Sequence, residues 1–323
     1  MVAPTTEPTA VLYIAAAPRS GTTIVSSLLG EVPGIFNAGE VRFLWKQIVE
    51  AGTCGCGEHL DRCEVWSRAL DATVGHAVNG VTHDVVRGGT AHSLIRTLPL
   101  GLARRRLLGR ISAPLRLHLD RTLPVYSAVA AVRRSDLVVD SSKSPSYAFL
   151  LAGSPELTVH LLHVVRDPRA VVYSWLRERG NGAPRRLRLQ AIVYHALKWT
   201  AWNLWIEMLV RPRSATYLRV GYEAFARAPY TQLSRIVASR GLDFRHMPIA
   251  GPDVHLAHLD PNHTVDGNGY RFRVGAVPIQ PDEEWTQSMR RHERLVVEAL
   301  TWPLLRRYGF RRRARRERAW QNA

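Results

Sequence analysis

The stretch VLYIAAAPRSGTTI, residues 11–24, carries the strongest indication of fold in this sequence. The apolar run over residues 11–17 is typical of a buried strand, and residues 22–29 are typical of a helix that begins directly after a turn. Such a strand, turn and helix can cradle a phosphate group at the helix N-terminus. The turn lacks the Gly-Lys pair of a nucleotide-triphosphate P-loop, because Ser and Thr flank Gly21. ATP or GTP chemistry is therefore not the first expectation.

The same alternation of strand and helix returns along the chain. Apolar runs at residues 136–140, 157–165 and 215–220 predict further strands, the first two followed by turn residues and a helix, and the extended piece GIFNAGE ends at Glu40. Alternating strands and helices predict an α/β fold, with a parallel sheet of about four or five strands covered by helices on both faces. In one long apolar helix, three tryptophans recur at helical spacing, which favours a role in the core over stacking on a ligand. They are Trp199, Trp202 and Trp205.

The length of 323 residues is compatible with one large domain, which we place at residues 11–310. Residues 67–134 lack strand character and predict a helical insertion with breaks near Gly88-Gly89, Pro99 and Pro114. We expect this insertion to form part of a substrate pocket. Residues 1–10 are expected to be disordered, and residues 311–323 form a basic tail.

The charge favours anionic partners. Lys and Arg number 44 against 27 Asp and Glu, a net charge of +17, and nearly all of the positive charge is arginine. A nucleic-acid-binding protein is one hypothesis, but no helix-turn-helix, finger or RNA-binding signature supports specific nucleic-acid recognition. No run approaches the ~20 apolar residues of a membrane span, and the first residues lack a signal-peptide layout. The expectation is a cytoplasmic protein, with peripheral membrane contact as a further option.

Four polar clusters fall at the ends of the expected strands, where parallel sheets bind ligands. The first is the opening turn, where backbone N–H groups and hydroxyls can hold a phosphate and Arg19 adds a charged group. The second is RDPRAVVYSW, with Arg166 at a strand end and Ser174 on the next helix. Glu40 and Lys143 follow two other strands. Two separate anion sites suggest a ligand with two separate phosphate positions. The residues of the opening turn are Arg19, Ser20, Gly21, Thr22 and Thr23.

These four stretches together resemble the sulfotransferases that use 3′-phosphoadenosine 5′-phosphosulfate (PAPS). PRSGTT is similar to the family's 5′-phosphosulfate loop, and RDPRAVVYSW is similar to its 3′-phosphate element, with Arg166 and Ser174 as the contacts. GEVRF resembles the segment of the carbohydrate and tyrosylprotein branches in which the Glu, here Glu40, is the catalytic base. Several carbohydrate enzymes have His where this chain has Arg42. The resemblance extends from about residue 11 to 310, outside the insertion, and points to bacterial members.

The resemblance implies a P-loop-containing nucleotide-binding-like three-layer fold and transfer of a sulfuryl group from PAPS. In that reaction Glu40 would take the acceptor's proton, and Arg19, Lys143 and the loop amides would stabilise charge on the leaving group. No metal is required. The acceptor would be a hydroxyl, less readily an amine, of a small-molecule, glycosylated or lipid-linked compound.

A late polar and glycine-rich loop, HTVDGNGYRF, is expected to form no helix or strand of its own. By the same resemblance, this loop and the residue after it offer Arg271 or Arg273 to the 3′-phosphate or the adenine. The loop can equally be a surface turn.

The runner-up among enzymes is a nucleotide kinase or hydrolase with a degenerate P-loop. Asp140, at a strand end, is its one candidate for a magnesium ligand. A magnesium requirement would favour this alternative.

All three cysteines lie in TCGCGEHLDRC, residues 53–63. Cys54, Cys56 and Cys63 could form a zinc site with His59, but Cys-x-Cys is tighter than the usual zinc spacing. A disulfide and free thiols remain open as alternatives. The sequence does not give the oligomeric state.

Overall fold

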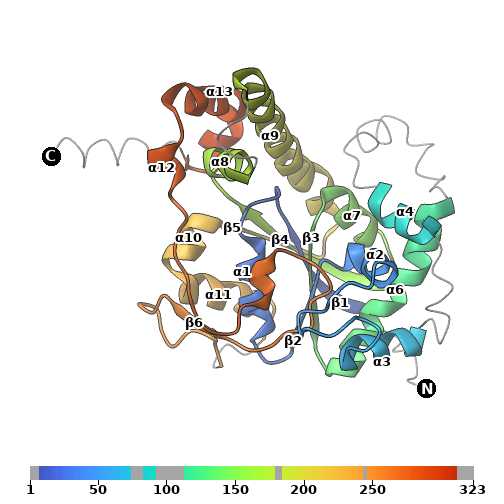
Figure 1. Ribbon diagram of the computed structural model, residues 1–323. Helices are drawn as coiled ribbons and strands as arrows, with labels where there is room; N and C mark the ends of the chain where they lie inside the picture. Colours follow the sequence, from blue (N-terminus) through green and yellow to red (C-terminus); the bar gives the residue numbers. More distant parts are fainter. Residues whose placement is uncertain (1–6, 74–82, 92–112, 179–183, 243–245, 311–323) are drawn as a thin grey trace.

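A computed structural model describes residues 7–73, 83–91, 113–178, 184–242 and 246–310 (Figure 1). The basic tail and parts of the expected insertion, including Pro99, lie outside the described residues. The first strand begins at Thr9, two residues before the expected domain boundary. None of the described helices is both long and apolar enough to cross a bilayer.

Five parallel strands form the central sheet, in the order β2-β3-β1-β4-β5. The α/β fold with a parallel sheet flanked by helices is thereby confirmed. β1 lies at the centre, and the chain leaves β1 towards β2 but leaves β4 towards β5. The carboxyl ends of β1 and β4 therefore border a topological switch point, where open α/β sheets bind ligands. The strands are β1 (Thr9–Ala15), β2 (Ile35–Gly39), β3 (Leu137–Lys143), β4 (Leu157–Val165) and β5 (Thr216–Gly221).

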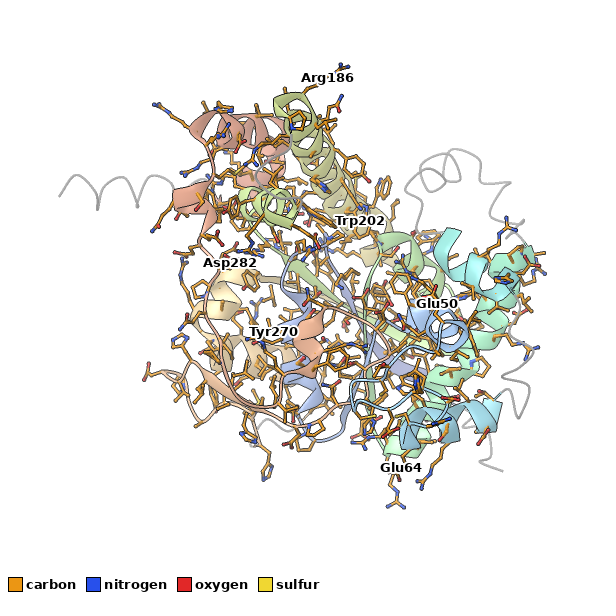
Figure 2. The ribbon with its side chains drawn as sticks, in the orientation of Figure 1. Glu50, Glu64, Arg186, Trp202, Tyr270 and Asp282 are labelled. Atoms are coloured by element: carbon orange, nitrogen blue, oxygen red, sulfur yellow. The ribbon has the colours of Figure 1, made fainter. Side chains whose placement is uncertain are left out.

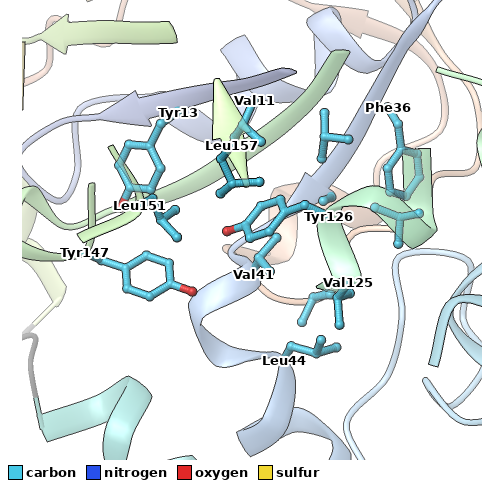
Figure 3. Packing of buried hydrophobic residues seen from close by; sticks show 14 of the residues in the cluster. Val11, Tyr13, Phe36, Val41, Leu44, Val125, Tyr126, Tyr147, Leu151 and Leu157 are labelled. Carbon is cyan, nitrogen blue, oxygen red and sulfur yellow. The ribbon is translucent and has the colours of Figure 1, made fainter. Parts of the chain in front are cut away.

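Helices cover both faces of the sheet because the strands are apolar on both sides. One face packs against α1 (Thr22–Gly30), α10 (Tyr222–Arg227) and α11 (Pro229–Ala238). The other face, seen from close by in Figure 3, places Val11 and Tyr13 of β1 against Tyr126 and Tyr147. Its covering helices are α2 (Leu44–Val49) after a 3-10 turn (Val41–Phe43), α3 (Glu64–Thr73), α4 (His83–Ala91), α6 (Ala113–Arg133) and α7 (Pro145–Leu151).

A helical group stands beyond the carboxyl ends of β4 and β5 (Figure 1). In it α9 packs against α8 and α13, and Trp199 and Trp202 of α9 are buried. The expected core role is confirmed for these two tryptophans. The group comprises α8 (Pro168–Glu178), α9 (Arg185–Trp205) with a π-helical turn (Ile206–Val210) and a 3-10 turn (Arg211–Arg213), α12 (Trp285–Ser288) and α13 (Arg291–Arg307).

Two local expectations were wrong. Gly88 and Gly89 do not break a helix but lie inside α4, because α4 packs closely on α6. A Cβ on Gly88 would lie 2.1 Å from the Pro114 carbonyl oxygen. The late loop also has structure of its own, a 3-10 turn (Gly269–Phe272) flanked by the antiparallel pair β6 (Leu256–Leu259) and β7 (Gly275–Pro278).

Candidate functional site

The turn after β1 has an unusual backbone. Arg19 and Gly21 both have positive φ values, 71° and 75°, and α1 begins at Thr22. A turn with left-handed residues that leads into a helix N-terminus can form an anion-binding concavity. Ser20 is buried, and its Oγ has no hydrogen-bond partner within the described part of the chain. The Arg19 guanidinium forms an ion pair with Glu178. The turn therefore combines backbone donors, an unused hydroxyl and a cation.

Arg166 follows β4 directly and reaches the turn. Its Nη1 donates to the Arg19 carbonyl oxygen at 3.0 Å, and its Nη2 lies 3.0 Å from a carboxylate oxygen of Asp282. The guanidinium lies 4.7 Å from the centre of the Tyr222 ring. Arg166 is largely buried, yet its Nε has no partner among the described residues. The residue is held in place and still has a donor available for a ligand.

Glu40 and Lys143 come together although 103 residues separate them. Glu40 directly follows β2 and Lys143 is the last residue of β3. These two strands are neighbours in the sheet, and the two side chains form an ion pair. Lys143 has a positive φ of 66°, a conformation that is uncommon for a residue with a Cβ and that is often found at functional sites. The Lys143 and Glu40 side chains are 17% and 12% exposed, so water screens the pair only weakly.

A cavity of about 540 Å³ lies over the carboxyl ends of the strands. This volume is typical of a small-molecule site. Ser20 and Glu40 are not among its lining residues; Ser20 belongs to the same turn, and Glu40 contacts Lys143. Seven of the residues expected from the sequence line the cavity: Arg19, Gly21, Thr22, Thr23, Lys143, Arg166 and Ser174.

The two arginines of the late loop do not line this cavity. Arg271 is buried, and its guanidinium donates to the carbonyl oxygens of Thr264 and Thr53 at 2.7 and 2.8 Å. Arg273 instead stacks on Tyr270. The loop contributes Asn268 and Tyr270 to the cavity. Figure 2 labels Tyr270, on the 3-10 turn in front of α1, and Asp282, on the segment between β7 and α12.

Sequence analysis did not identify the aromatic wall of the cavity. Tyr222 and Phe225 come from the start of α10, Trp175 from α8 and Tyr270 from the late loop. Tyr222 packs against the opening turn so closely that a Cβ on Gly21 would lie 2.2 Å from its ring. The position of Tyr222 directly after β5 was the available signal, because every strand end borders this edge of the sheet.

Asp140 does not reach the cavity. Its side chain is fully buried, and its two carboxylate oxygens accept hydrogen bonds from Tyr126 at 2.6 Å and from the Ser142 N–H at 2.8 Å. Burial raises the pKa of Asp140 to about 6, although the hydrogen bonds from Ser142 and Tyr126 act in the opposite direction. A carboxylate enclosed in this way is a poor magnesium ligand, which counts against the kinase alternative.

The three cysteines do lie together, but their partner is not the expected histidine. His59 directs its Nδ1 to the Ala51 carbonyl oxygen, 2.9 Å away. The fourth member is His263, so the expected set of Cys54, Cys56, His59 and Cys63 is corrected to one with His263. Cys54, Cys56 and Cys63 are free thiols. His263 comes from a segment 200 residues after Cys63, so the Cys-x-Cys spacing could not identify it as the fourth residue.

A second, smaller cavity of about 300 Å³ lies at the other end of β2, lined by Gly34, Ile35 and Arg133 among others. It contains none of the residues expected to bind the nucleotide or to act in catalysis.

Comparisons with known proteins point to one family. The sequence model of the sulfotransferase family matches residues 12–246. Among solved structures, the chain is similar to the "Sulfotransferase Domain from the Curacin Biosynthetic Pathway", with 16% identity, a TM-score of 0.47, and coverage of 90% of this chain and 96% of that one. It is also similar to a sulfotransferase from Alicyclobacillus acidocaldarius, with 14% identity, a TM-score of 0.39, and coverage of 93% of each chain. No curated protein matches the sequence.

Proposed function

Because the chain belongs to the sulfotransferase family, we propose that it transfers the sulfuryl group of PAPS to a hydroxyl, less readily an amine, of a small-molecule, glycosylated or lipid-linked acceptor. One observation carries the choice of donor. The Arg19–Thr23 turn and the Arg166–Ser174 pair border the same cavity, from the neighbouring strands β1 and β4. A donor with a 5′-phosphosulfate and a 3′-phosphate needs two such anion sites.

The donor atoms at these two sites fit anionic groups. Ser20 Oγ and Arg166 Nε are buried and have no partner among the described residues, which is costly unless a ligand supplies acceptors. Glu178 and Asp282 pair with Arg19 and Arg166, and the phosphosulfate and the 3′-phosphate would replace these carboxylates. The rings of Trp175, Tyr222, Phe225 and Tyr270 offer surfaces on which an adenine can stack.

In the proposed reaction the acceptor oxygen attacks sulfur in line, and the bond from sulfur to the bridging phosphate oxygen breaks. Glu40 takes the acceptor's proton. Lys143 contacts Oε1 of Glu40, so Oε2 is the oxygen assigned to that proton. Arg19, Lys143 and the amides of the opening turn stabilise the negative charge on the departing 3′-phosphoadenosine 5′-phosphate. The products are this nucleotide and a sulfate ester.

Calorimetric titration with 3′-phosphoadenosine 5′-phosphate, in buffer freed of divalent cations by a resin, tests the donor. The wild type should bind with micromolar affinity, and Arg166→Ala should weaken binding about 30- to 150-fold, since a charge-assisted hydrogen bond contributes about 2–3 kcal/mol. Arg235→Ala is the matched control, because Arg235 is exposed on α11 and does not line the cavity. Glu40→Gln should keep the affinity and lose at least about 100-fold in turnover with any acceptor found.

Equal binding of ATP that requires magnesium would reject the PAPS assignment and restore the kinase alternative. Equal losses in Arg166→Ala and Arg235→Ala would mean that Arg166 has no specific role. Near-normal turnover in Glu40→Gln would remove Glu40 as the base.

A further inference from the structure

The cluster of three thiols and an imidazole lies outside the nucleotide cavity and plays no part in the proposed reaction. One ligand atom from each of Cys54, Cys56, Cys63 and His263 lies within 4.8 Å of every other, and the Cys63 Sγ lies 3.2 Å from the His263 Nδ1. In a tetrahedral zinc site with three sulfurs and one nitrogen, bond lengths of about 2.0–2.3 Å place neighbouring ligand atoms about 3.5–3.8 Å apart. The cluster therefore needs only small side-chain movements to surround one ion.

The backbone around Cys54 and Cys56 forms a tight turn. The Cys54 N–H donates to the Glu58 carbonyl oxygen at 2.7 Å, and the Gly57 N–H donates to the Cys54 carbonyl oxygen at 2.9 Å. Gly57, directly after Cys56, has a positive φ of 94°. The turn therefore holds Cys54 and Cys56 close together, in the same cluster as Cys63 and His263.

Gly55 explains why the tight Cys-x-Cys spacing works here. Its N–H donates to the Thr264 carbonyl oxygen at 3.0 Å, and a Cβ at this position would lie 2.0 Å from Asn262 Oδ1. The turn therefore packs directly on the segment that carries His263. The fourth ligand comes from another loop. The local segment therefore does not have to supply all the ligands, and the usual Cys-x₂₋₄-Cys spacing is not required.

Contacts around the cluster orient His263 from both sides. The Trp66 indole Nε1 donates to the His263 carbonyl oxygen at 2.6 Å. Arg271 joins the two halves of the cluster, because its guanidinium binds the carbonyl oxygens of Thr53 and Thr264, one beside Cys54 and the other beside His263. This gives Arg271 a structural role in place of a contact with the nucleotide. Hydrogen bonds that fix the positions of the ligand residues are typical of metal sites.

From this geometry we propose that Cys54, Cys56, Cys63 and His263 bind one structural zinc ion. Three thiolates and an imidazole favour zinc over the harder cations, and four protein ligands complete its tetrahedral shell without leaving a position for substrate. Cys54 and Cys63 are buried, whereas Cys56 and His263 are half-buried, so the ion can enter from the solvent side. A disulfide would use only two of the three sulfurs and would leave the position of His263 unexplained.

The zinc site would hold the loop beside Glu40 in place. Val265, two residues after His263, donates its N–H to the Ala38 carbonyl oxygen at 3.0 Å, next to Gly39 and Glu40. A Cβ on Gly39 would lie 2.9 Å from both Thr264 and Val265. The same loop continues to Asn268 and Tyr270 in the cavity wall. Zinc would thus connect the cysteine loop, the strand end that carries Glu40 and the wall of the cavity.

The test measures metal directly and does not depend on sulfotransferase activity. Protein purified without chelator should contain about one zinc per chain by plasma mass spectrometry, and competition with a chromogenic chelator gives the affinity. Cys56→Ser and His263→Ala should each lose at least about 100-fold in affinity. His59→Ala should bind like the wild type, because His59 is directed at Ala51. His263→Cys should restore binding, which separates loss of a ligand from loss of fold.

Cobalt gives a second readout. The reduced protein should bind cobalt with the thiolate charge-transfer band and the intense visible bands of a tetrahedral site, and His59→Ala should keep them. Hydrogen exchange should show that metal removal increases exchange over residues 262–272.

Three results would overturn the zinc site: wild-type affinity no higher than that of His263→Ala, equal losses in His59→Ala and His263→Ala, or a Cys54–Cys63 disulfide in freshly isolated protein. Nucleotide binding by the zinc-free protein would leave the proposed function standing in each case.

Discussion

Gly21 is the residue on which the geometry of the opening turn depends most directly. Its φ of 75° lies in the left-handed region, and the Tyr222 ring occupies the space that a side chain would need. Two separate requirements, backbone conformation and close packing, therefore select glycine here.

Gly21→Ala should lower nucleotide affinity more than an alanine at another glycine with positive φ does. A Cβ 2.2 Å from the ring must displace Tyr222, against which Arg166 also stacks, so nucleotide affinity should fall at least about tenfold. Gly241→Ala is the control, because Gly241 has a similar φ of 69° and a Cβ there would meet no described atom within 4 Å. Calorimetric titration of both variants checks this. An equal effect in both would show that the contact with Tyr222 is unimportant.

At the scale of elements, strand β3 and helix α6 share the buried hydrogen bond between Asp140 and Tyr126. Burial is the main cause that raises the pKa of Asp140 to about 6, from an ordinary carboxyl value of 3.8. Between these two pH values the folded protein binds more protons at this site than the unfolded chain does. Stability contributed by this group is therefore largest at low pH and is lost as the pH rises to about 6.

Asp140→Asn should remove this pH dependence while keeping an oxygen that can accept from Ser142. The free energy of unfolding of the wild type relative to Asp140→Asn should fall by about 2 kcal/mol between pH 4 and pH 7. Urea unfolding at several pH values measures it, with Asp136→Asn, at the exposed position just before the same strand, as control. A difference that stays constant with pH would show that Asp140 titrates normally.

At the scale of the whole molecule, Arg169 joins the sheet edge to the C-terminal helix. Its guanidinium binds both carboxylate oxygens of Asp167, at 2.9 and 2.6 Å, and Glu298 of α13 at 2.7 Å. Arg169 and Asp167 are almost fully buried. The second arginine of RDPR therefore has a structural role, while the first faces the cavity.

Arg169→Met should destabilise the protein by about 3–5 kcal/mol, because it leaves the Asp167 carboxylate buried without its partner. Adding Asp167→Asn should restore part of the loss. Arg177→Met, which removes a half-exposed ion pair from the same helix, should cost less than about 1 kcal/mol. Urea unfolding of the three variants compares them. Similar losses for Arg169→Met and Arg177→Met would contradict the role of burial.

The α/β alternation and the identity of the residues that follow each strand could be predicted from the sequence. Val11 and its apolar neighbours cannot be exposed, so the strands had to be buried, and a buried parallel sheet places all its strand ends along one edge. That argument was sufficient to bring Arg19, Lys143 and Arg166 to one cavity. The catalytic role of Glu40 and the nucleotide contacts of Ser20 and Ser174 stay predictions. Arg271 and Arg273 do not line the cavity, so this part of the expected site is not brought there.

Only the tertiary structure shows which residues from distant segments are in contact. His263 lies 200 residues from Cys63, and Tyr222 fills the space above Gly21, yet neither pairing leaves a local pattern. The spacing of apolar residues indicates which face of a helix or strand is buried. Loops that pack through single side chains have no such regular spacing. Strand order has the same origin, because the sheet is held by hydrogen bonds between backbones that are alike in every sequence. The zinc ligand set and the aromatic wall therefore emerged only when the loops were placed on the sheet.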